Sequence, residues 1–252
     1  GQRRAVWISH LAHECSHRWW GYRVPTTVIG DGGTWLREGL AEWTGLRVSG
    51  ELVGKKAERA LFDRIFSFYL KTADLRRTAR SPDIIYANEP SLVDATYIDP
   101  SRIAYVKGAL VHRVLERRLG RHAFLAGLKR FAADRAHKFT SVDDLARALG
   151  GDAPAVVAYY AGTTRLPDFE LLSVNAEEGS AVATLRCKDP DWPGGAVSCR
   201  ITTPVGVADI DVSVNGGTGT LHWRGVGRPV RIEVDPERVF LDPVRSNNVW
   251  VR

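Results

Sequence analysis

The stretch HECSHRWWG, residues 13–21, decides how this sequence is interpreted. His13 and His17 are four residues apart, so on a helix both side chains project from one face, one turn apart. Two imidazoles in that position can bind one metal ion, and Glu14 beside them can hold and deprotonate a water molecule on that ion. The alternative is a buried helix with two structural histidines, so the surrounding sequence has to discriminate.

The residues around the histidines predict two amphipathic helices. Apolar residues recur at helical spacing through Val6, Leu11 and Trp19, and Gly21 marks the end of the first helix. After a loop over 22–33, the sequence TWLREGLAEWTGLRV repeats the pattern at Leu36, Leu40, Trp43 and Leu46. A catalytic zinc needs a third protein ligand and an open position for water. Glu38, on the second helix, is the candidate for that ligand.

HECSHRWWG and TWLREGLAEW together resemble the aminopeptidase N type of gluzincin metallopeptidases, in which H-E-x-x-H on one helix is followed by W-L-x-E-G-[FL]-A on the next. The resemblance implies that His13, His17 and Glu38 bind zinc and that Glu14 is the general base. The spacing between His17 and Glu38 is two residues longer than is usual in the family, and the extra residues fall in a loop. Two imidazoles and one carboxylate suit zinc best, although cobalt or manganese could replace it.

A third segment, YVKGALVHRVL from Tyr105, resembles the family's Y-x-K-G-A stretch. The resemblance implies that the Tyr105 hydroxyl donates a hydrogen bond to the oxyanion of the tetrahedral intermediate, opposite the zinc. A packing role for this tyrosine is the alternative. The similarity covers most of residues 5–175 and, more loosely, DPERVFLDPVRSNNVW near the C-terminus.

The family's exopeptidases also carry an upstream Gly-x-Met-Glu-Asn strand, whose glutamate holds the free α-amino group of the substrate. This sequence contains no methionine and no such strand. We therefore expect the catalytic part of a longer zinc aminopeptidase that acts on peptides, with a further domain upstream. Two alternatives remain, a zinc-bound scaffold or interaction module without turnover and a zinc hydrolase of a non-peptide substrate.

Residues near the motif have weaker claims to the site. Glu42, one turn after Glu38, could accept a hydrogen bond from the far nitrogen of a ligand histidine, or be a solvated carboxylate. His10 is expected behind the ligands or at the surface. Cys15 is turned away from the ligand face and is expected to be buried as a small hydrophobic residue.

Other aromatic and basic residues have simpler interpretations. Trp19 and Trp20 are expected to be core aromatics that hold the first helix in place. The arginines Arg76, Arg77 and Arg80 form a surface run, with binding of a substrate carboxylate as the alternative. No register places Tyr97 in the site.

The composition is that of a folded globular protein. The 252 residues are 44% hydrophobic and 25% charged. Arginines spread through the sequence contribute most of the formal charge of +6, a distribution that favours a solvated surface, so no nucleic-acid partner is expected. No apolar run approaches the roughly 18 residues needed to cross a bilayer, so no transmembrane segment is expected. The sequence leaves the compartment open.

Helical and strand patterns divide the chain into two predicted domains. Residues 1–167 are expected to form a mainly α-helical, thermolysin-like gluzincin portion, with further helices over 55–73, 102–120, 121–138 and 141–150 and a loop over 79–100. Ser141 and Asp144 predict a capping box at the last of these helices. From 168 the apolar period becomes two, which predicts a β-sandwich over 168–252.

The cysteines leave one question about the second domain. Cys187 and Cys199 flank the turn-rich stretch KDPDWPGGAVS, so in an oxidising compartment they could form a hairpin disulfide. Two unpaired thiols in a small β domain are the equal alternative.

Overall fold

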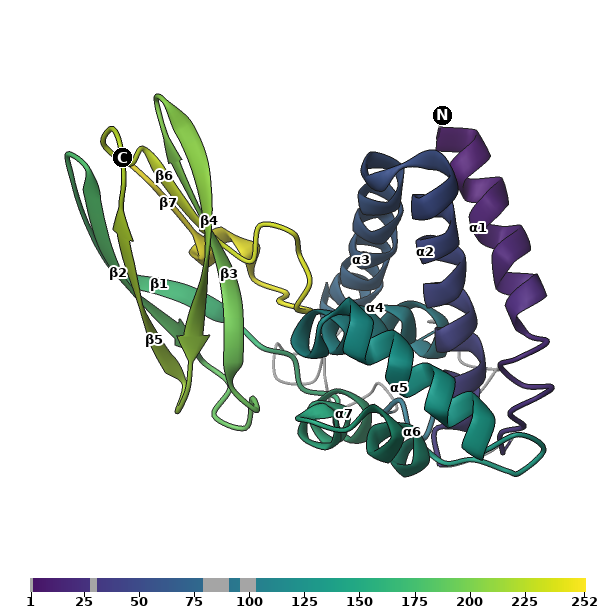
Figure 1. Cartoon of the computed structure of the whole chain (residues 1–252). Coiled ribbons are helices and arrows are strands. Elements are labelled where there is room, and N and C mark those ends of the chain that lie inside the picture. Colours follow the sequence, from purple (N-terminus) through teal and green to yellow (C-terminus); the bar gives the residue numbers. More distant parts are fainter. Residues whose placement is uncertain (1, 28–30, 79–90, 96–102) are drawn as a thin grey trace. The chain divides into compact units, whose positions relative to one another are not determined.

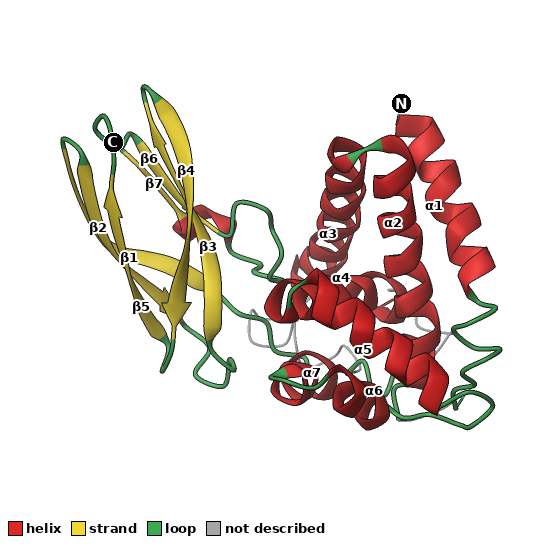
Figure 2. Cartoon of the chain, in the orientation of Figure 1, coloured by secondary structure: helices red, strands yellow, loops and turns green. Residues whose placement is uncertain are grey.

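The computed structural model describes residues 2–27, 31–78, 91–95 and 103–252. The chain forms two compact units, residues 1–164 and 165–252 (Figure 1). The first unit is helical and the second contains two antiparallel sheets (Figure 2). The predicted fold class, a helical portion followed by a β-sandwich, is therefore confirmed. The assignment of separate domains to 1–167 and 168–252 stays a prediction.

The helical unit contains the predicted helices and one further helix. Its elements are α1 (Gln2–Ser16), η1 (Trp35–Gly39), α2 (Leu40–Val53), α3 (Lys55–Thr78), α4 (Ile103–Leu119), α5 (Arg121–Asp134), α6 (Val142–Leu149) and α7 (Ala153–Gly162). The capping box of Ser141 and Asp144 is present at α6. The sequence pattern missed α7 because APAVVAYYAG is apolar nearly all round and shows no amphipathic period. None of the described helices has both the length and the apolarity of a membrane span.

The buried face of α1 differs from the prediction. Its buried residues are small or polar, namely Ala5, Ser9, His13 and Ser16. Leu11 is 65% exposed and Trp19, beyond the end of α1, is 52% exposed, so the predicted apolar face and the core role of Trp19 are wrong. The predicted apolar positions of the second helix are buried, as expected. Close packing explains the difference, because a helix that lies tightly against its neighbour has room only for small side chains.

The contact between α1 and α2 is unusually close. A Cβ atom on Gly45 would lie 2.3 Å from the carbonyl oxygen of Ser9, so only glycine fits at this position. One turn further on, Ser49 Oγ donates a hydrogen bond of 2.9 Å to the Ala5 carbonyl. Glycine and hydroxyl side chains therefore let the two helix backbones come together.

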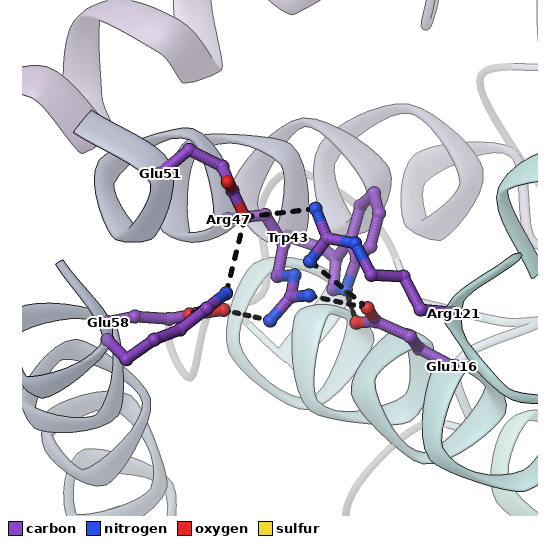
Figure 3. A network of polar contacts seen from close by, with 7 residues as sticks. Trp43, Arg47, Glu51, Glu58, Glu116 and Arg121 are labelled. Atoms are coloured by element: carbon purple, nitrogen blue, oxygen red, sulfur yellow. Dashed lines mark hydrogen bonds and ion pairs between the residues drawn. The ribbon is translucent and has the colours of Figure 1, made fainter.

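A network of charged residues ties α2, α3, α4 and α5 together (Figure 3). Arg47 on α2 pairs with Glu58 on α3 and, at 2.6 Å, with Glu116 on α4. Trp43 Nε1 donates to the other carboxylate oxygen of Glu116 at 3.3 Å, and Arg121 on α5 lies 3.8 Å from Glu116. Burial raises the pKa of Glu116, against the opposing charge of Arg47. Loss of one partner from a buried ion pair is strongly destabilising. The four helices must therefore stay close enough for these pairs to remain formed.

The β unit is a sandwich of two antiparallel sheets (Figure 2). The strand order in one sheet is β1 (Phe169–Glu177), β2 (Ser180–Cys187), β5 (Thr218–Arg224). The strand order in the other sheet is β4 (Gly206–Val214), β3 (Gly195–Thr203), β6 (Arg231–Val234), β7 (Val249–Val251). A short 3-10 helix, η3 (Arg245–Asn248), precedes β7 in the chain. The alternating residues Leu221, Trp223, Ile232 and Val234 are buried between the sheets, as their period of two predicts. The predicted turn at 215–219 connects β4 to β5 and so carries the chain from one sheet to the other.

Cys187 and Cys199 are both buried free thiols, which decides between the two alternatives left by the sequence. Burial raises the pKa of Cys187 to about 11 and that of Cys199 to about 12. Both thiols are therefore protonated at neutral pH and act as small core side chains.

His112 on α4 is a fully buried histidine. Its ring stacks on Trp35, with the ring centroids 5.1 Å apart, and neither ring nitrogen has a hydrogen-bond partner in the described part of the chain. Burial lowers the pKa of His112 to about 3, so the ring is neutral in the folded protein at neutral pH.

Replacement of Gly45 by alanine tests the close helix contact. Gly45→Ala is expected to lower the free energy of unfolding by about 1–3 kcal/mol, because the added methyl group meets the Ser9 carbonyl. Gly162→Ala is the control, since nothing lies within 4 Å of a Cβ atom at Gly162. Urea unfolding followed by circular dichroism measures both, and equal effects of the two substitutions would contradict the contact.

The burial of His112 predicts a loss of stability in acid. The histidine has a pKa of about 6.5 when unfolded and about 3 when folded, so its contribution is complete above pH 6.5 and declines as the pH falls. Between pH 7 and pH 4.5 the cost is about 2–3 kcal/mol. Replacement by phenylalanine, which can also stack on Trp35, removes the titrating group.

The measurement is urea unfolding at several pH values for wild type, His112→Phe and the exposed control His122→Phe. The difference in unfolding free energy between pH 7 and pH 4.5 is expected to shrink only in His112→Phe. A pH dependence that is the same in all three proteins would show that His112 does not carry this effect.

Candidate metal centre

The two motif histidines lie together where α1 ends. His13 is on the last turn of α1, and His17 is in the turn that follows. Their ring centroids are 4.9 Å apart, with the rings nearly perpendicular. The Nε2 atoms of both rings face the same atom, Glu38 Oε2, at 3.5 Å from His13 and 3.4 Å from His17.

Glu38 reaches this position from η1, a single turn of π-helix that continues into α2. Such turns recur at functional sites, because the wider turn redirects side chains. The indole of Trp35 is fully buried and fixes η1 against α4, and its Nε1 donates to the Gly108 carbonyl at 3.3 Å. If Gly39 carried a Cβ atom, that atom would lie 2.7 Å from Trp35 Cδ1, and a Cβ atom at Gly108 would lie 2.5 Å from the same Cδ1. Both motif glycines are therefore needed to pack η1 on α4.

The far nitrogens of the two histidines are held by hydrogen bonds. His13 Nδ1 lies 2.9 Å from Glu42 Oε2, and His17 Nδ1 lies 3.1 Å from the carbonyl oxygen of Trp20. A carbonyl or carboxylate oxygen can only accept, so each Nδ1 carries the proton. With a metal ion in place of a second proton, each ring would direct its Nε2 lone pair at the metal, which is the tautomer that a metal ligand needs.

The carboxylates give this centre a strong preference for positive charge. Burial lowers the pKa of His13, but hydrogen bonds with Glu38 and Glu42 outweigh burial and raise the pKa to about 9. Burial raises the pKa of Glu38, but the His13 hydrogen bond and the charges of His17 and Arg37 lower it overall. The same field that favours a proton on His13 favours a metal cation in its place.

Two distances within the donor set also fit zinc. The candidate ligand atoms of His13, His17 and Glu38 all lie within 4.8 Å of one another. Ligands about 2.0–2.1 Å from a tetrahedral ion are about 3.3–3.4 Å apart. The distances of 3.4 and 3.5 Å from the two histidine nitrogens to Glu38 are close to that value. Three ligands leave a fourth tetrahedral position for water or substrate.

Tyr105 lies beside this centre, and Glu14 follows His13 directly in the sequence. Glu14 is exposed on α1, and its carboxylate has no partner among the described residues. Tyr105 is half-buried near the start of α4, and its ring lies parallel to that of His13 with a centroid distance of 6.1 Å. The structure thus places Tyr105 beside the metal-ligand group, although it is 67 residues beyond Glu38 in the sequence.

Comparison with known proteins agrees with this geometry. The sequence model of the peptidase family M1 domain matches residues 2–159, more than half of the chain. The chain belongs to peptidase family M1. It is 28% identical over 185 residues to mitochondrial aminopeptidase 2 of Saccharomyces cerevisiae, an alignment that covers 70% of this chain and 18% of the yeast protein. It is 27% identical over 184 residues to aminopeptidase M1-A of rice (Oryza sativa subsp. japonica), covering 71% of this chain and 19% of the rice protein.

A solved structure shows the same fold. Aminopeptidase A of Legionella pneumophila, crystallised with aspartic acid, superimposes with a TM-score of 0.65 at 18% identity. The match covers 94% of this chain and 26% of the Legionella protein. The M1 chain described here thus spans about a fifth of the length of the curated relatives that it matches.

Three other sequence predictions around the M1 motif have mixed outcomes. His10 is exposed, so of its two expected positions, behind the ligands or at the surface, the surface position is the one found. Cys15 is an exposed free thiol, so the prediction of a buried side chain is wrong. Cys15 instead lines a cavity between α1, α2 and α5. Of the two alternatives for Glu42, the hydrogen bond to the far nitrogen of His13 holds. The side chains of Arg76 and Arg77, and residues Arg80 and Tyr97, lie outside the described residues.

Sequence reasoning missed two features of this M1 centre. Arg37 Nε lies 3.3 Å from Glu38 Oε1, the carboxylate oxygen that faces away from the histidines. The charge of Arg37 beside a glutamate in W-L-x-E-G was visible in the sequence. The bond from His17 to the Trp20 carbonyl had no sequence signal, because any residue can offer a backbone carbonyl.

Removal of the Glu42 carboxylate is expected to weaken metal binding. In Glu42→Gln the hydrogen bond that sets the tautomer of His13 is weakened, so zinc affinity should fall about 10- to 100-fold. Glu51→Gln is the matched control, because Glu51 is on the same helix but is exposed and pairs with Lys55. Competition with a fluorescent chelator measures both affinities, and equal zinc affinity in the two variants would show that Glu42 does not position His13.

Proposed function

We propose that this chain is the metal-binding part of a zinc aminopeptidase that removes N-terminal residues from peptides. The observation that carries the proposal is the convergence of His13 Nε2 and His17 Nε2 on Glu38 Oε2. Membership of family M1 and the names of the two curated relatives support the same reaction class. His13, His17 and Glu38 would hold the zinc.

The remaining residues have distinct proposed roles. When bound, zinc would polarise the scissile carbonyl and lower the pKa of water. Glu14, which is exposed and follows His13 directly in the sequence, takes a proton from the attacking water and passes it to the leaving amine. The Tyr105 hydroxyl donates a hydrogen bond to the oxyanion that forms on the substrate. Glu42 and the Trp20 carbonyl keep the two imidazoles in the ligand tautomer.

A cavity beside the centre offers room for a peptide side chain. It has a volume of about 400 Å³ and shares Glu42 and Tyr105 with the centre. Leu46, Ile65 and Phe68 contribute apolar walls from α2 and α3. A cavity with apolar walls and a charged side chain, Arg64, next to the proposed reacting groups supports an organic substrate such as a peptide over a small inorganic one.

Metal content tests the ligand assignment. The wild-type chain is expected to bind about one zinc ion. Glu38→Ala is expected to lose most of the bound zinc, because a carboxylate ligand is gone, whereas Glu14→Gln is expected to keep its zinc. Elemental analysis after dialysis against zinc measures all three. A wild-type chain that takes up no zinc, or a Glu38→Ala chain that keeps its full content, would contradict the proposed centre.

Hydrolysis of aminoacyl substrates tests the catalytic assignment and requires the complete protein that contains this chain. Glu14→Gln is expected to lower kcat about 10²- to 10⁴-fold with zinc retained, because the general base is lost. Glu51→Gln is the control and should keep full activity. Zinc bound stoichiometrically to a wild-type protein that hydrolyses no peptide would favour the scaffold instead.

A further inference from the structure

A second cavity lies between α1, α2 and α5 and is separate from the one at the metal centre. It has a volume of about 560 Å³, within the range of about 300–1,000 Å³ that small-molecule sites occupy. Its walls include the rings of Trp20 and Trp43 and the side chain of Leu128. Trp19 and Leu125 also line it and are 52% and 41% exposed, so apolar surface reaches solvent here.

The hydroxyl groups in this wall are already satisfied. Thr44 Oγ1 donates to the Leu40 carbonyl at 2.7 Å and accepts from Trp20 Nε1 at 3.2 Å. Ser16 Oγ donates to the His13 carbonyl at 2.7 Å. An occupant therefore meets a mainly apolar interior, which favours a hydrocarbon body.

One charged side chain completes the chemistry of the cavity. Lys129 on α5 is the single charged residue among the described lining residues, and no carboxylate lies with it. Lys129 is exposed and has no ion pair or hydrogen bond within the described part of the chain. A hydrocarbon wall with one cation at its edge is complementary to a ligand with an apolar chain and one anionic end.

The cavity wall is connected directly to the metal centre. Trp20 presents its ring to the cavity while its carbonyl accepts the hydrogen bond from His17 Nδ1. Ser16, another wall residue, is bonded to the backbone of His13. A ligand that shifts the backbone of Trp20 would therefore also shift the carbonyl that orients His17.

We propose that this cavity binds an alkyl carboxylate. The hydrocarbon chain lies against Trp20, Trp43 and Leu128, and the carboxylate pairs with Lys129. Occupancy of the cavity shifts the Trp20 carbonyl and with it the orientation of His17, so the ligand alters metal binding from outside the centre. The binding part of this inference does not depend on the proposed peptidase function.

Calorimetric titration of decanoate into the metal-free 252-residue chain tests the site. Wild type is expected to bind one decanoate saturably, and Lys129→Glu to bind it roughly tenfold more weakly because the cation becomes an anion. Lys56→Glu is the matched control, since Lys56 is exposed on α3 and does not line the cavity. Its affinity should equal that of wild type. Absence of saturable binding, or an equal loss in both lysine variants, would overturn the site.

Two further arms separate the hydrocarbon and the charge. Ala132→Phe places a ring in the cavity and is expected to abolish binding, with circular dichroism confirming the fold. The neutral 1-decanol, which keeps the chain but loses the charge, is expected to bind at least about fivefold more weakly than decanoate. Unchanged binding to folded Ala132→Phe would refute the location, and equal binding of decanol would refute the carboxylate.

The link to the centre is measured by zinc affinity with and without saturating decanoate. Coupling is expected to change zinc affinity at least about threefold, and zinc must change decanoate affinity by the same factor. Decanoate binding with unaltered zinc affinity would refute the link to His17. A chain that binds decanoate but takes up no zinc would refute the proposed metal function and leave the cavity assignment standing.

Discussion

The close approach of α1 to η1 and α2 is the constraint on which the helical unit depends. Glycine at position 45 allows the Ser9 carbonyl to lie against α2, and this spacing brings the ring of His13 between Glu38 and Glu42. A longer distance between the helices would separate the imidazole nitrogens from both carboxylates at once. The geometry of the metal centre therefore follows from backbone packing as much as from the ligands themselves.

The buried charged groups in the described part of the chain have partners. Glu38 is 3% exposed and faces two imidazoles, while Glu116, 8% exposed, is satisfied by Arg47 and by the indole of Trp43. Each arrangement offsets the cost of removing a carboxylate from water. His112 is the contrasting case, because it is buried neutral and without a partner among the described residues, and this makes it sensitive to acid.

Residues at and just beyond the end of α1 face two different surroundings. His13 and His17 face the carboxylates of η1 and α2, whereas Cys15, Ser16 and Trp19 line the apolar cavity towards α5. The exposed Cys15 and Trp19, which look misplaced for a core helix, are explained by this second environment. A substitution on one face of the segment therefore also acts on the other, through the short backbone that both share.

The sequence by itself identified the candidate metal ligands, the order of helices before strands and the membership of a metallopeptidase family, because H-E-x-x-H and W-L-x-E-G encode their chemistry in local spacing. Local periodicity could not show that α1 turns small residues inward, or that α7, apolar all round, is a helix. Only the tertiary structure decided that Glu42 and the Trp20 carbonyl hold the imidazoles, and that Tyr105 stacks beside His13. These contacts join residues whose proximity depends on how closely the helices pack, and close packing is a property of the folded chain that no local pattern records.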